Sequence, residues 1–209
     1  MQRAKPYYKK LFVFLDDINE LIKINILKQH NISIIYDKQQ FDNNNFEVIK
    51  KFCKDNKIEL YILDNFKLAI KHKLNGVVIS HTNREIIYYG NLLSKCRKFK
   101  IIGKVHNQLD YYFKQRQGCK TVIFSPIFLN EKYSLNSVRG VLKFNLISMN
   151  WRLGVCPLGG INLKNYKKIL LTNNQSFAIK SFITKHQNEV KKIYLLNQNK
   201  FLLKKNQPS

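Results

Sequence analysis

Residues 32–63 read ISIIYDKQQFDNNNFEVIKKFCKDNKIELYIL. A short run rich in isoleucine and leucine stands at each end, and in the polar segment between them Phe46, Ile49 and Phe52 recur at helical spacing. Short, nearly continuous apolar runs are typical of parallel strands that are covered on both faces. The stretch therefore predicts one strand–helix–strand unit, whose crossover is right-handed.

The same alternation recurs along the whole chain. Eight apolar runs, about 20 residues apart, alternate with segments of helical periodicity. The runs are residues 11–15, 32–36, 59–63, 76–80, 100–105, 121–127, 154–158 and 176–182. Eight such units in 209 residues predict a single (β/α)8 barrel, the TIM-barrel fold. If two of the runs were not strands, an open α/β sheet of about five or six strands would be the alternative.

The chain shows no internal linker. It holds only 4 Pro and 8 Gly, and no stretch rich in Gly or Ser divides it. We therefore expect one barrel domain over residues 1–196, whose last helix lies within residues 185–196. A basic tail over residues 197–209 is expected to follow.

The charge of the chain is strongly positive. It holds 37 Lys and Arg against 13 Asp and Glu, a net charge of +24. Such a balance indicates a polyanionic partner, either nucleic acid or a phosphorylated small substrate. The basic residues are spread along the chain instead of forming a block, which is typical of a solvated surface. We therefore expect small phosphorylated substrates, and nucleic-acid binding is the less favoured alternative.

Neither the apolar runs nor the cysteines indicate export. No run approaches the roughly 20 apolar residues that cross a bilayer, and the run at residues 11–15 is shorter than a signal-peptide core. Cys53, Cys96, Cys119 and Cys156 stand singly, without the close spacing of zinc ligands. We expect a cytoplasmic protein without membrane contact, in which the cysteines are small buried apolar residues.

Active sites of such barrels lie at the carboxyl ends of the strands. After the seventh run, residues 158–162 read LGGIN. Gly159 and Gly160 let backbone N–H groups approach an anion, and a helix that begins there would add partial positive charge. Ser181, in the eighth run, can donate a hydroxyl hydrogen bond. These features predict a phosphate site, although paired glycines also occur in tight turns.

Other strand ends carry polar side chains that suit catalysis. Asp64 and Asn83 are oxygen ligands of the kind that Mg²⁺ prefers, but each also precedes a helical segment that it could cap. His106 follows the fifth run and could act as a general acid or base, or could simply pack. The residues alone leave these alternatives open.

Two motifs carry a resemblance to a known family. Residues 124–128 read FSPIF, and residues 157–161 read PLGGI. They match the Gly/Ser-Pro-Ile-Phe and Ala-Ile-Gly-Gly-Ile motifs of the thiamine phosphate synthase family, and they also resemble its close relative, thiazole tautomerase. Weaker likenesses lie at residues 62–69, 76–83 and 106–107.

The resemblance implies a transferase of thiamine biosynthesis with a TIM-barrel fold. The family joins hydroxymethylpyrimidine pyrophosphate to a thiazole phosphate carboxylate, releases pyrophosphate, and uses Mg²⁺ to hold the pyrophosphate. Carried over to this chain, the metal side would be Asp64 and Asn83, and the catalytic side chains would be His106 and Lys38. The phosphate-binding residues would be Ser125, Gly159, Gly160, Ser181 and Lys132. The substrate pocket would be lined by Tyr36, His81, Pro126 and Phe128.

The chain departs from the family pattern mainly on the metal and pyrimidine side. Asn83 stands where the family has a second metal carboxylate, which removes a full charge from a site for a dication. Residues 103–106, Gly-Lys-Val-His, shorten the family's Gly-x-Ser-x-His and lose the Ser. Three interpretations follow: a divergent synthase, a tautomerase-like isomerase that uses His106 or His81 without Mg²⁺, and a non-catalytic paralogue that binds a phosphorylated ligand or nucleic acid.

Overall fold

The structure, a computed structural model, describes residues 10–15, 31–37, 42–85, 99–129, 137–172 and 174–180. Within these ranges, eight strands form one sheet in which all neighbouring strands are parallel. The strands are β1 Lys10–Leu15, β2 Ile32–Tyr36, β3 Glu59–Leu63, β4 Gly76–Ile79, β5 Lys100–Val105, β6 Thr121–Phe124, β7 Gly154–Pro157 and β8 Ser176–Ile179.

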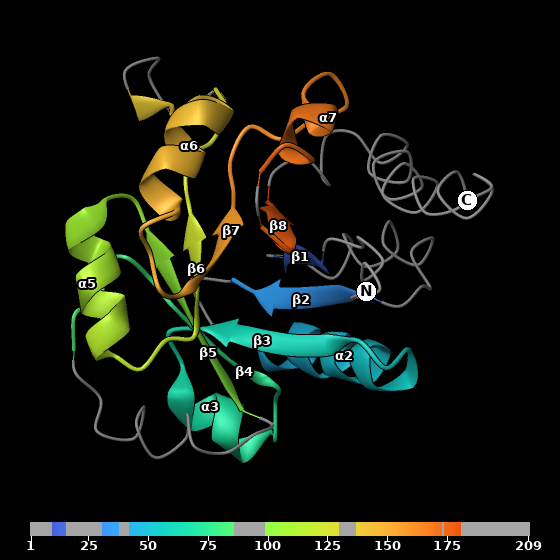
Figure 1. Ribbon diagram of the computed structural model, residues 1–209. Helices are drawn as coiled ribbons and strands as arrows, with labels where there is room; N and C mark the ends of the chain where they lie inside the picture. Colours follow the sequence, from blue (N-terminus) through green and yellow to red (C-terminus); the bar gives the residue numbers. More distant parts are fainter. Residues whose placement is uncertain are drawn as a thin grey trace, which may run out of the picture.

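The sheet curls into a nearly closed barrel (Figure 1). β1 pairs with both β2 and β8, so that Leu11 lies opposite Ile32 on one side and Phe177 on the other. Between β7 and β8, a parallel bridge joins Leu158 to Ala178. The predicted (β/α)8 barrel is confirmed, and the open-sheet alternative is wrong.

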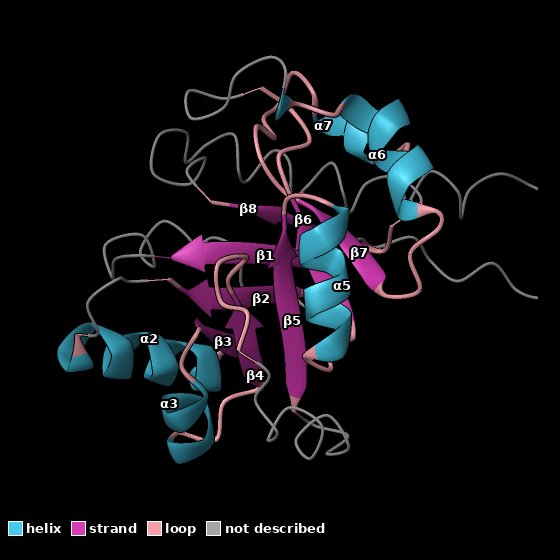
Figure 2. Ribbon diagram, turned by 90° about the vertical axis from the view of Figure 1, so that its left-hand side faces the viewer, coloured by secondary structure: helices cyan, strands magenta, loops and turns pink. Residues whose placement is uncertain are grey.

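The described helices lie outside the strands (Figures 1 and 2). They are α2 Asn43–Asp55, α3 Phe66–Lys71, α5 Gln108–Arg116, α6 Gly140–Ser148 and α7 Tyr166–Ile169. The helix predicted from apolar spacing is α2, in which Phe46 and Ile49 are buried. Asp42 caps this helix, because its Oδ1 accepts a hydrogen bond from the backbone N–H of Asn44 at 3.0 Å.

Side chains along each strand point alternately into the barrel and towards the helices. The buried interior cluster consists of Phe12, Phe14, Ile35, Tyr61, Val78, Ile102, Ile123, Cys156, Leu158 and Ala178. Residues of the opposite parity, such as Val13 and Ile34, belong to a larger cluster that includes Phe46 and Ile49 of α2. The barrel therefore has a filled interior and a separate apolar layer under its helices.

Ion pairs fill the interior at the amino end of the strands. Glu59 accepts hydrogen bonds from the ammonium groups of Lys10 and Lys100. Burial acts to raise the pKa of Glu59, but these two bonds and one from Tyr61 outweigh it and lower the pKa to about 2. Paired charges therefore occupy the interior at the amino end, and active sites of such barrels lie at the opposite, carboxyl end.

Some strands end earlier than the sequence predicts. β6 ends at Phe124 instead of residue 127, since Pro126 has no N–H to contribute to the ladder. Lys38, Lys132, Ser181, the helix expected within residues 185–196 and the tail at residues 197–209 lie outside the described residues. In the part of the chain that the structure describes, no helix is both long and apolar enough to cross a membrane.

Candidate active site

The loops that follow β6 and β7 lie against each other at the carboxyl end of the barrel. The backbone N–H of Ile127 donates to the carbonyl of Leu158 at 2.9 Å. The N–H of Phe128 donates to the carbonyl of Gly159 at 3.1 Å. The two motifs that the sequence singles out, residues 124–128 and 157–161, therefore form one backbone-bonded unit.

The paired glycines are required by this contact. Gly159 and Gly160 have φ angles of +103° and +66°, which side chains strongly disfavour. A Cβ at position 160 would lie 2.4 Å from the carbonyl oxygen of Phe128, and one at position 159 would lie 3.1 Å from Pro126. Among the described residues, the N–H groups of both glycines donate no hydrogen bond, so they can donate to an anion.

The expected helix start after the glycines is wrong. Residues 161 and 162 are not helical, a turn follows, and α7 begins only at Tyr166 and is 4 residues long. Asn165 instead folds back and donates from its Nδ2 to the Gly160 carbonyl at 2.6 Å. Any anion binding here therefore depends on loop N–H groups and neighbouring side chains, without a helix dipole.

His106, at the end of β5, reaches the β6 loop. Its Nδ1 lies 3.0 Å from the carbonyl oxygen of Ser125 and 3.2 Å from the Ser125 hydroxyl. The carbonyl accepts the Nδ1 proton, so the neutral ring presents Nε2 as a base. Burial lowers the pKa of His106, against the opposing effect of the Ser125 carbonyl. The ring of His81 meets that of His106 edge-on, with 4.4 Å between ring centres.

Arg139, just before α6, ties the ends of β5 and β6 together. Its guanidinium donates to the Ser125 carbonyl at 3.0 Å and also to the His106 carbonyl. The same group stacks over the Phe124 ring, with its Cζ 4.3 Å from the ring centre. Arg139 thus fixes the two carbonyl groups on either side of the His106–Ser125 contact.

A cavity of about 500 Å³ lies beside Arg139, between α5 and α6. Its walls include His106 and Pro126 from the predicted site and the basic side chains Arg139 and Lys143. It is a second place, next to His106, where an anionic group can lie.

Asp64 and Asn83 meet at the ends of β3 and β4. Asp64 has a φ of +50°, and its Oδ1 accepts the Ser80 N–H at 2.8 Å and the Asn83 Nδ2–H at 3.3 Å. The capping interpretation is wrong for Asp64, because the side chain of Asn65 caps α3. Asp64 instead holds the loop after β4.

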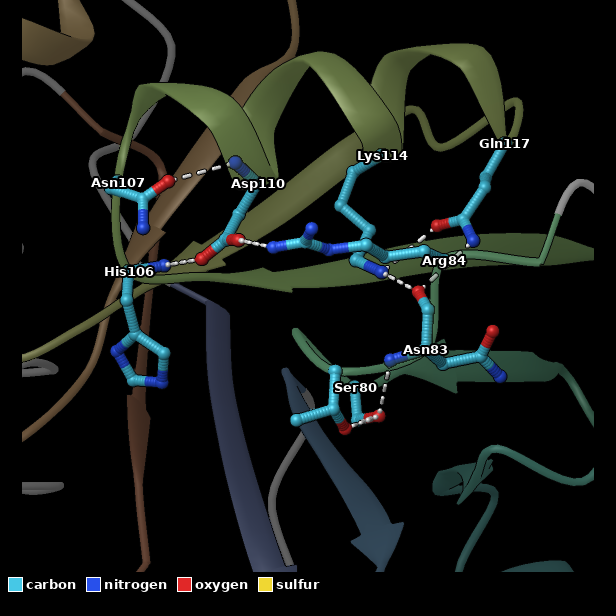
Figure 3. Close-up of polar contacts among 9 residues, drawn as sticks. Ser80, Asn83, Arg84, His106, Asn107, Asp110, Lys114 and Gln117 are labelled. Carbon is cyan, nitrogen blue, oxygen red and sulfur yellow. Dashed lines mark hydrogen bonds and ion pairs between the residues drawn. The ribbon is translucent and has the colours of Figure 1, made fainter.

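Helix α5 supports that loop from behind (Figure 3). The buried Lys114 donates from Nζ to the Asn83 carbonyl at 2.6 Å and to Gln117 at 2.9 Å, and Gln117 donates to the Glu85 carbonyl at 2.7 Å. The Lys114 stem lies over Gly103 of β5, where a Cβ would come within 2.5 Å of it.

The same helix also holds the backbone at the end of β5 (Figure 3). Asp110 is buried, and its carboxylate accepts the His106 N–H at 2.9 Å. Asn107 caps α5 by accepting the Asp110 N–H at 2.9 Å. One helix therefore fixes both His106 and Asn83.

The mouth of the barrel carries two lysines. Lys104 and Lys180 place their Nζ atoms 5.3 Å and 5.9 Å from the centre of the Phe14 ring, and Lys180 also forms an ion pair with Asp37. Tyr36, by contrast, packs against Phe46 of α2 with 5.6 Å between ring centres. The structure therefore places Tyr36 under a helix and not at the mouth.

The comparisons with known proteins agree with this geometry. Residues 22–183, which include β2 to β8, match a family model described as thiamine monophosphate synthase. The chain belongs to the thiamine monophosphate synthase family. Its low identity to relatives makes it a divergent member of the family.

Two similar relatives of this family member are thiamine-phosphate synthases. The protein from Pelagibacter ubique is 26% identical over 188 residues, which cover 83% of this chain and 89% of the relative. The protein from Flavobacterium psychrophilum is 26% identical over 159 residues, covering 73% and 76%. The structure of a thiamine phosphate pyrophosphorylase from Pyrococcus furiosus superposes with a TM-score of 0.71 at 15% identity, covering 94% of this chain and 98% of that one. That last likeness shows the fold alone.

The metal pair that the thiamine monophosphate synthase resemblance implies does not fit Mg²⁺ as it is arranged here. Asn83 points an amide N–H at Asp64, and its Oδ1 accepts the N–H of Glu85 at 3.1 Å. Mg²⁺ requires oxygen atoms, and a donor N–H occupies the direction in which the second oxygen would lie. Within the described ranges, no group of three or more His, Cys, Asp or Glu side chains is placed to hold a metal ion.

Two buried thiols of this thiamine monophosphate synthase family member are poor nucleophiles at neutral pH. Cys53, Cys119 and Cys156 are buried, as expected for small apolar residues. Burial raises the pKa of Cys53 and that of Cys119 to about 12, so both are protonated at neutral pH. Cys96 lies outside the described residues.

Several residues that shape the site in this family member were not predicted from the sequence. Arg139 and Lys114 belong to no motif, and their roles depend on contacts between distant segments. Lys104 and Lys180 did leave a signal, because each has the inward-facing parity of its strand. The predicted Lys38, Lys132 and Ser181 lie outside the described residues.

Proposed function

We propose that this chain is a thiamine phosphate synthase, which joins hydroxymethylpyrimidine pyrophosphate to a thiazole phosphate carboxylate and releases pyrophosphate. One observation carries the proposal: the backbone contact between the loops after β6 and β7, where Phe128 donates to Gly159. It brings together the two motifs that resemble the family. Membership of the family supports a transferase of thiamine biosynthesis.

The phosphate of the thiazole substrate would bind to the N–H groups of Gly159 and Gly160. Both glycines are half-buried at the carboxyl end of the barrel, where substrates of such barrels bind. The proposed phosphate site also includes the hydroxyl groups of Ser125 and Ser181 and the ammonium group of Lys132. Two N–H groups and two hydroxyl groups can donate hydrogen bonds to the phosphate oxygens. The lysine adds a positive charge next to the phosphate.

The proposed reaction breaks the C–O bond between the pyrimidine methylene and the pyrophosphate. The electron pair leaves with the pyrophosphate, and the pyrimidine carbocation that remains is attacked by the lone pair of the thiazole nitrogen. The carboxylate then leaves as CO2, and the electron pair that remains on the ring carbon takes up a proton from solvent, because the product carries hydrogen there. Such a reaction requires charge neutralisation and exclusion of water more than a strong base. Lys38 is proposed to bind the pyrophosphate through its ammonium group. Pro126 and Phe128 are proposed to line the substrate pocket.

The geometry of His106 supports a second candidate, a thiazole tautomerase-like isomerase. Its Nδ1 proton is held by the Ser125 carbonyl, and burial lowers its pKa, which together keep Nε2 unprotonated near neutral pH. Tautomerisation moves a proton within the thiazole phosphate carboxylate, and a base fixed beside a phosphate site can perform it. His81, whose ring contacts that of His106, would line the same pocket.

The test is a direct assay with purified protein and both substrates, with and without Mg²⁺, in which thiamine phosphate is quantified. The synthase proposal expects thiamine phosphate as the product. If no thiamine phosphate forms at saturating substrate, the synthase proposal is wrong. Tautomerisation of the thiazole phosphate carboxylate is then followed by NMR, and equal rates for wild type and His106→Ala would remove His106 from that reaction.

A further inference from the structure

Side chains from three strands converge inside the mouth of the barrel. Phe14 comes from β1, Lys104 from β5, and Lys180 directly follows β8. The Nζ atoms of the two lysines lie 5.3 Å and 5.9 Å from the centre of the Phe14 ring. Two ammonium groups carried by strands that do not pair with each other thus meet at one aromatic ring.

Strand alternation fixes these lysines inside the barrel. Lys104 stands two residues after Ile102, and Lys180 stands two residues after Ala178; Ile102 and Ala178 both belong to the buried interior cluster. Facing inward costs an ammonium group part of its hydration. Lys104 is half-buried, and the Lys180 side chain is 37% exposed. The two cations therefore lie where the interior changes from apolar packing to the open mouth.

Among the described residues, cationic side chains outnumber anionic ones at this level. Asp37, at the end of β2, forms an ion pair with Lys180, and its own side chain is only 7% exposed. Of the charged side chains that the described strand ends direct inward here, two are cationic and one is anionic. Cations in a concave site with apolar walls attract anions more strongly than cations on an open surface.

We propose that Lys104 and Lys180 form an anion site that takes the pyrophosphate group of the pyrimidine substrate without a divalent cation. The proposal rests on the proposed function for the identity of that substrate. On the other side of the mouth, Asn83 aims a donor N–H at Asp64, so that pair does not offer two oxygen ligands to a metal. The lysines supply the positive charge that the family resemblance assigns to Mg²⁺.

The experiment is isothermal titration of the full chain with inorganic pyrophosphate in EDTA, and then with Mg²⁺ in excess. It compares the wild type, Lys104→Met and Lys180→Met. Lys51→Met is the matched control, because Lys51 is exposed on α2 and its loss removes the same charge from the chain. Titration with inorganic phosphate separates this site from one that takes any phosphate group. Circular dichroism shows whether each variant is folded.

We expect the wild type to bind pyrophosphate in EDTA, with a Kd that Mg²⁺ changes by less than about threefold. Lys104→Met should weaken pyrophosphate binding by about tenfold or more, since a bond to a charged group is lost. Lys51→Met should stay within about twofold of wild type. Lys180→Met should also weaken binding, and it leaves Asp37 without its lysine, so Lys104→Met decides the test.

The proposal is overturned if the wild type binds pyrophosphate only with Mg²⁺, or not at all. It is also overturned if Lys104→Met binds as tightly as Lys51→Met. The outcome is separate from that of the synthase assay. If the protein makes no thiamine phosphate but binds pyrophosphate as expected, the lysine site stands and the proposed function is wrong. If the protein makes thiamine phosphate but does not bind pyrophosphate as expected, the proposed function stands and the lysine site is wrong.

Discussion

The two sides of the barrel mouth are held together by different kinds of contact. On one side, the loops after β6 and β7 bind each other through backbone groups, as Phe128 does with Gly159. On the other side, the ends of β3 and β4 depend on side chains, namely Asp64, Asn83 and the buried Lys114. The first side contains the two motifs that resemble the family, and the second has Asn83 where the resemblance implies a carboxylate.

This difference indicates which side of the mouth tolerates substitution. A site made of N–H groups at left-handed glycines cannot change residue without clashing with the backbone of Phe128. A site made of side chains can exchange a carboxylate for an amide while the loop keeps its hydrogen bonds, as Asn83 does with Glu85. We therefore regard the backbone side as the part of the site that is fixed by the fold.

The largest expected effect is that of Gly160→Ala. Its Cβ would lie 2.4 Å from the Phe128 carbonyl oxygen at a φ of +66°. Relief requires the two loops to separate, which should lower the free energy of unfolding by about 3 kcal/mol. Urea denaturation followed by circular dichroism measures the change.

Gly140→Ala is the matched control for that variant. Gly140 has nearly the same φ, +64°, but nothing lies within 4 Å of the position that its Cβ would take. Its free energy of unfolding should fall by only about 1 kcal/mol, which is the cost of placing alanine at a left-handed backbone position. Equal losses in the two variants would contradict a tight contact between the loops.

A smaller effect is expected from Asn83→Asp on the side-chain side. The change replaces the amide donor next to Asp64 by a second carboxylate, which should create a Mg²⁺ site of the usual oxygen type. Millimolar Mg²⁺ should then raise the Tm of the variant by about 3 °C or more and leave that of the wild type nearly unchanged. NaCl at equal ionic strength controls for screening. If Mg²⁺ raised the Tm of the wild type as much as that of the variant, Asn83 would already be part of a metal site.

The smallest effect concerns His106, which joins the two sides through Ser125 and Asp110. Burial lowers its pKa in the folded chain, so the unfolded chain binds its proton more readily. The stability that this provides is present above the unfolded pKa, about 6.5, and is lost as the pH falls through the lower folded value.

We expect the free energy of unfolding to fall between pH 7.5 and pH 5 for the wild type, and to fall less for His106→Gln. Glu59 stays ionised over this range, because its pKa is about 2. Urea denaturation at the two pH values measures both slopes. The same slope in the variant and the wild type would show that His106 is not the titrating group.

Much of the fold could be predicted because the local and global patterns agree. Each apolar run contains residues that face the barrel interior and residues that face the helices, such as Ile35 and Ile34 on β2. The helical spacing of Phe46 and Ile49 predicted α2. The turn after β7 was also predictable, since Gly159 and Gly160 mark it in the sequence. The residues at which strands end were harder to predict, because Pro126 prevents β6 from continuing beyond Phe124.

The rest could not be read from the sequence, because it depends on contacts between distant segments. Nothing near Lys114 shows that it lies over Gly103 and donates to the Asn83 carbonyl. The orientation of an amide is likewise set by its neighbours, and here Glu85 takes the oxygen of Asn83. Helix α7 was shorter than expected for the same reason, since Asn165 bonds back to the glycine loop.

We expect the backbone side of the mouth to hold a phosphate group. A crystal structure of the protein with bound thiazole phosphate carboxylate tests it most directly. Phosphate oxygens should then lie within about 3.2 Å of the backbone nitrogens of Gly159 and Gly160. A phosphate bound instead in the cavity between α5 and α6, on Arg139 and Lys143, with no contact to the glycines, would contradict it.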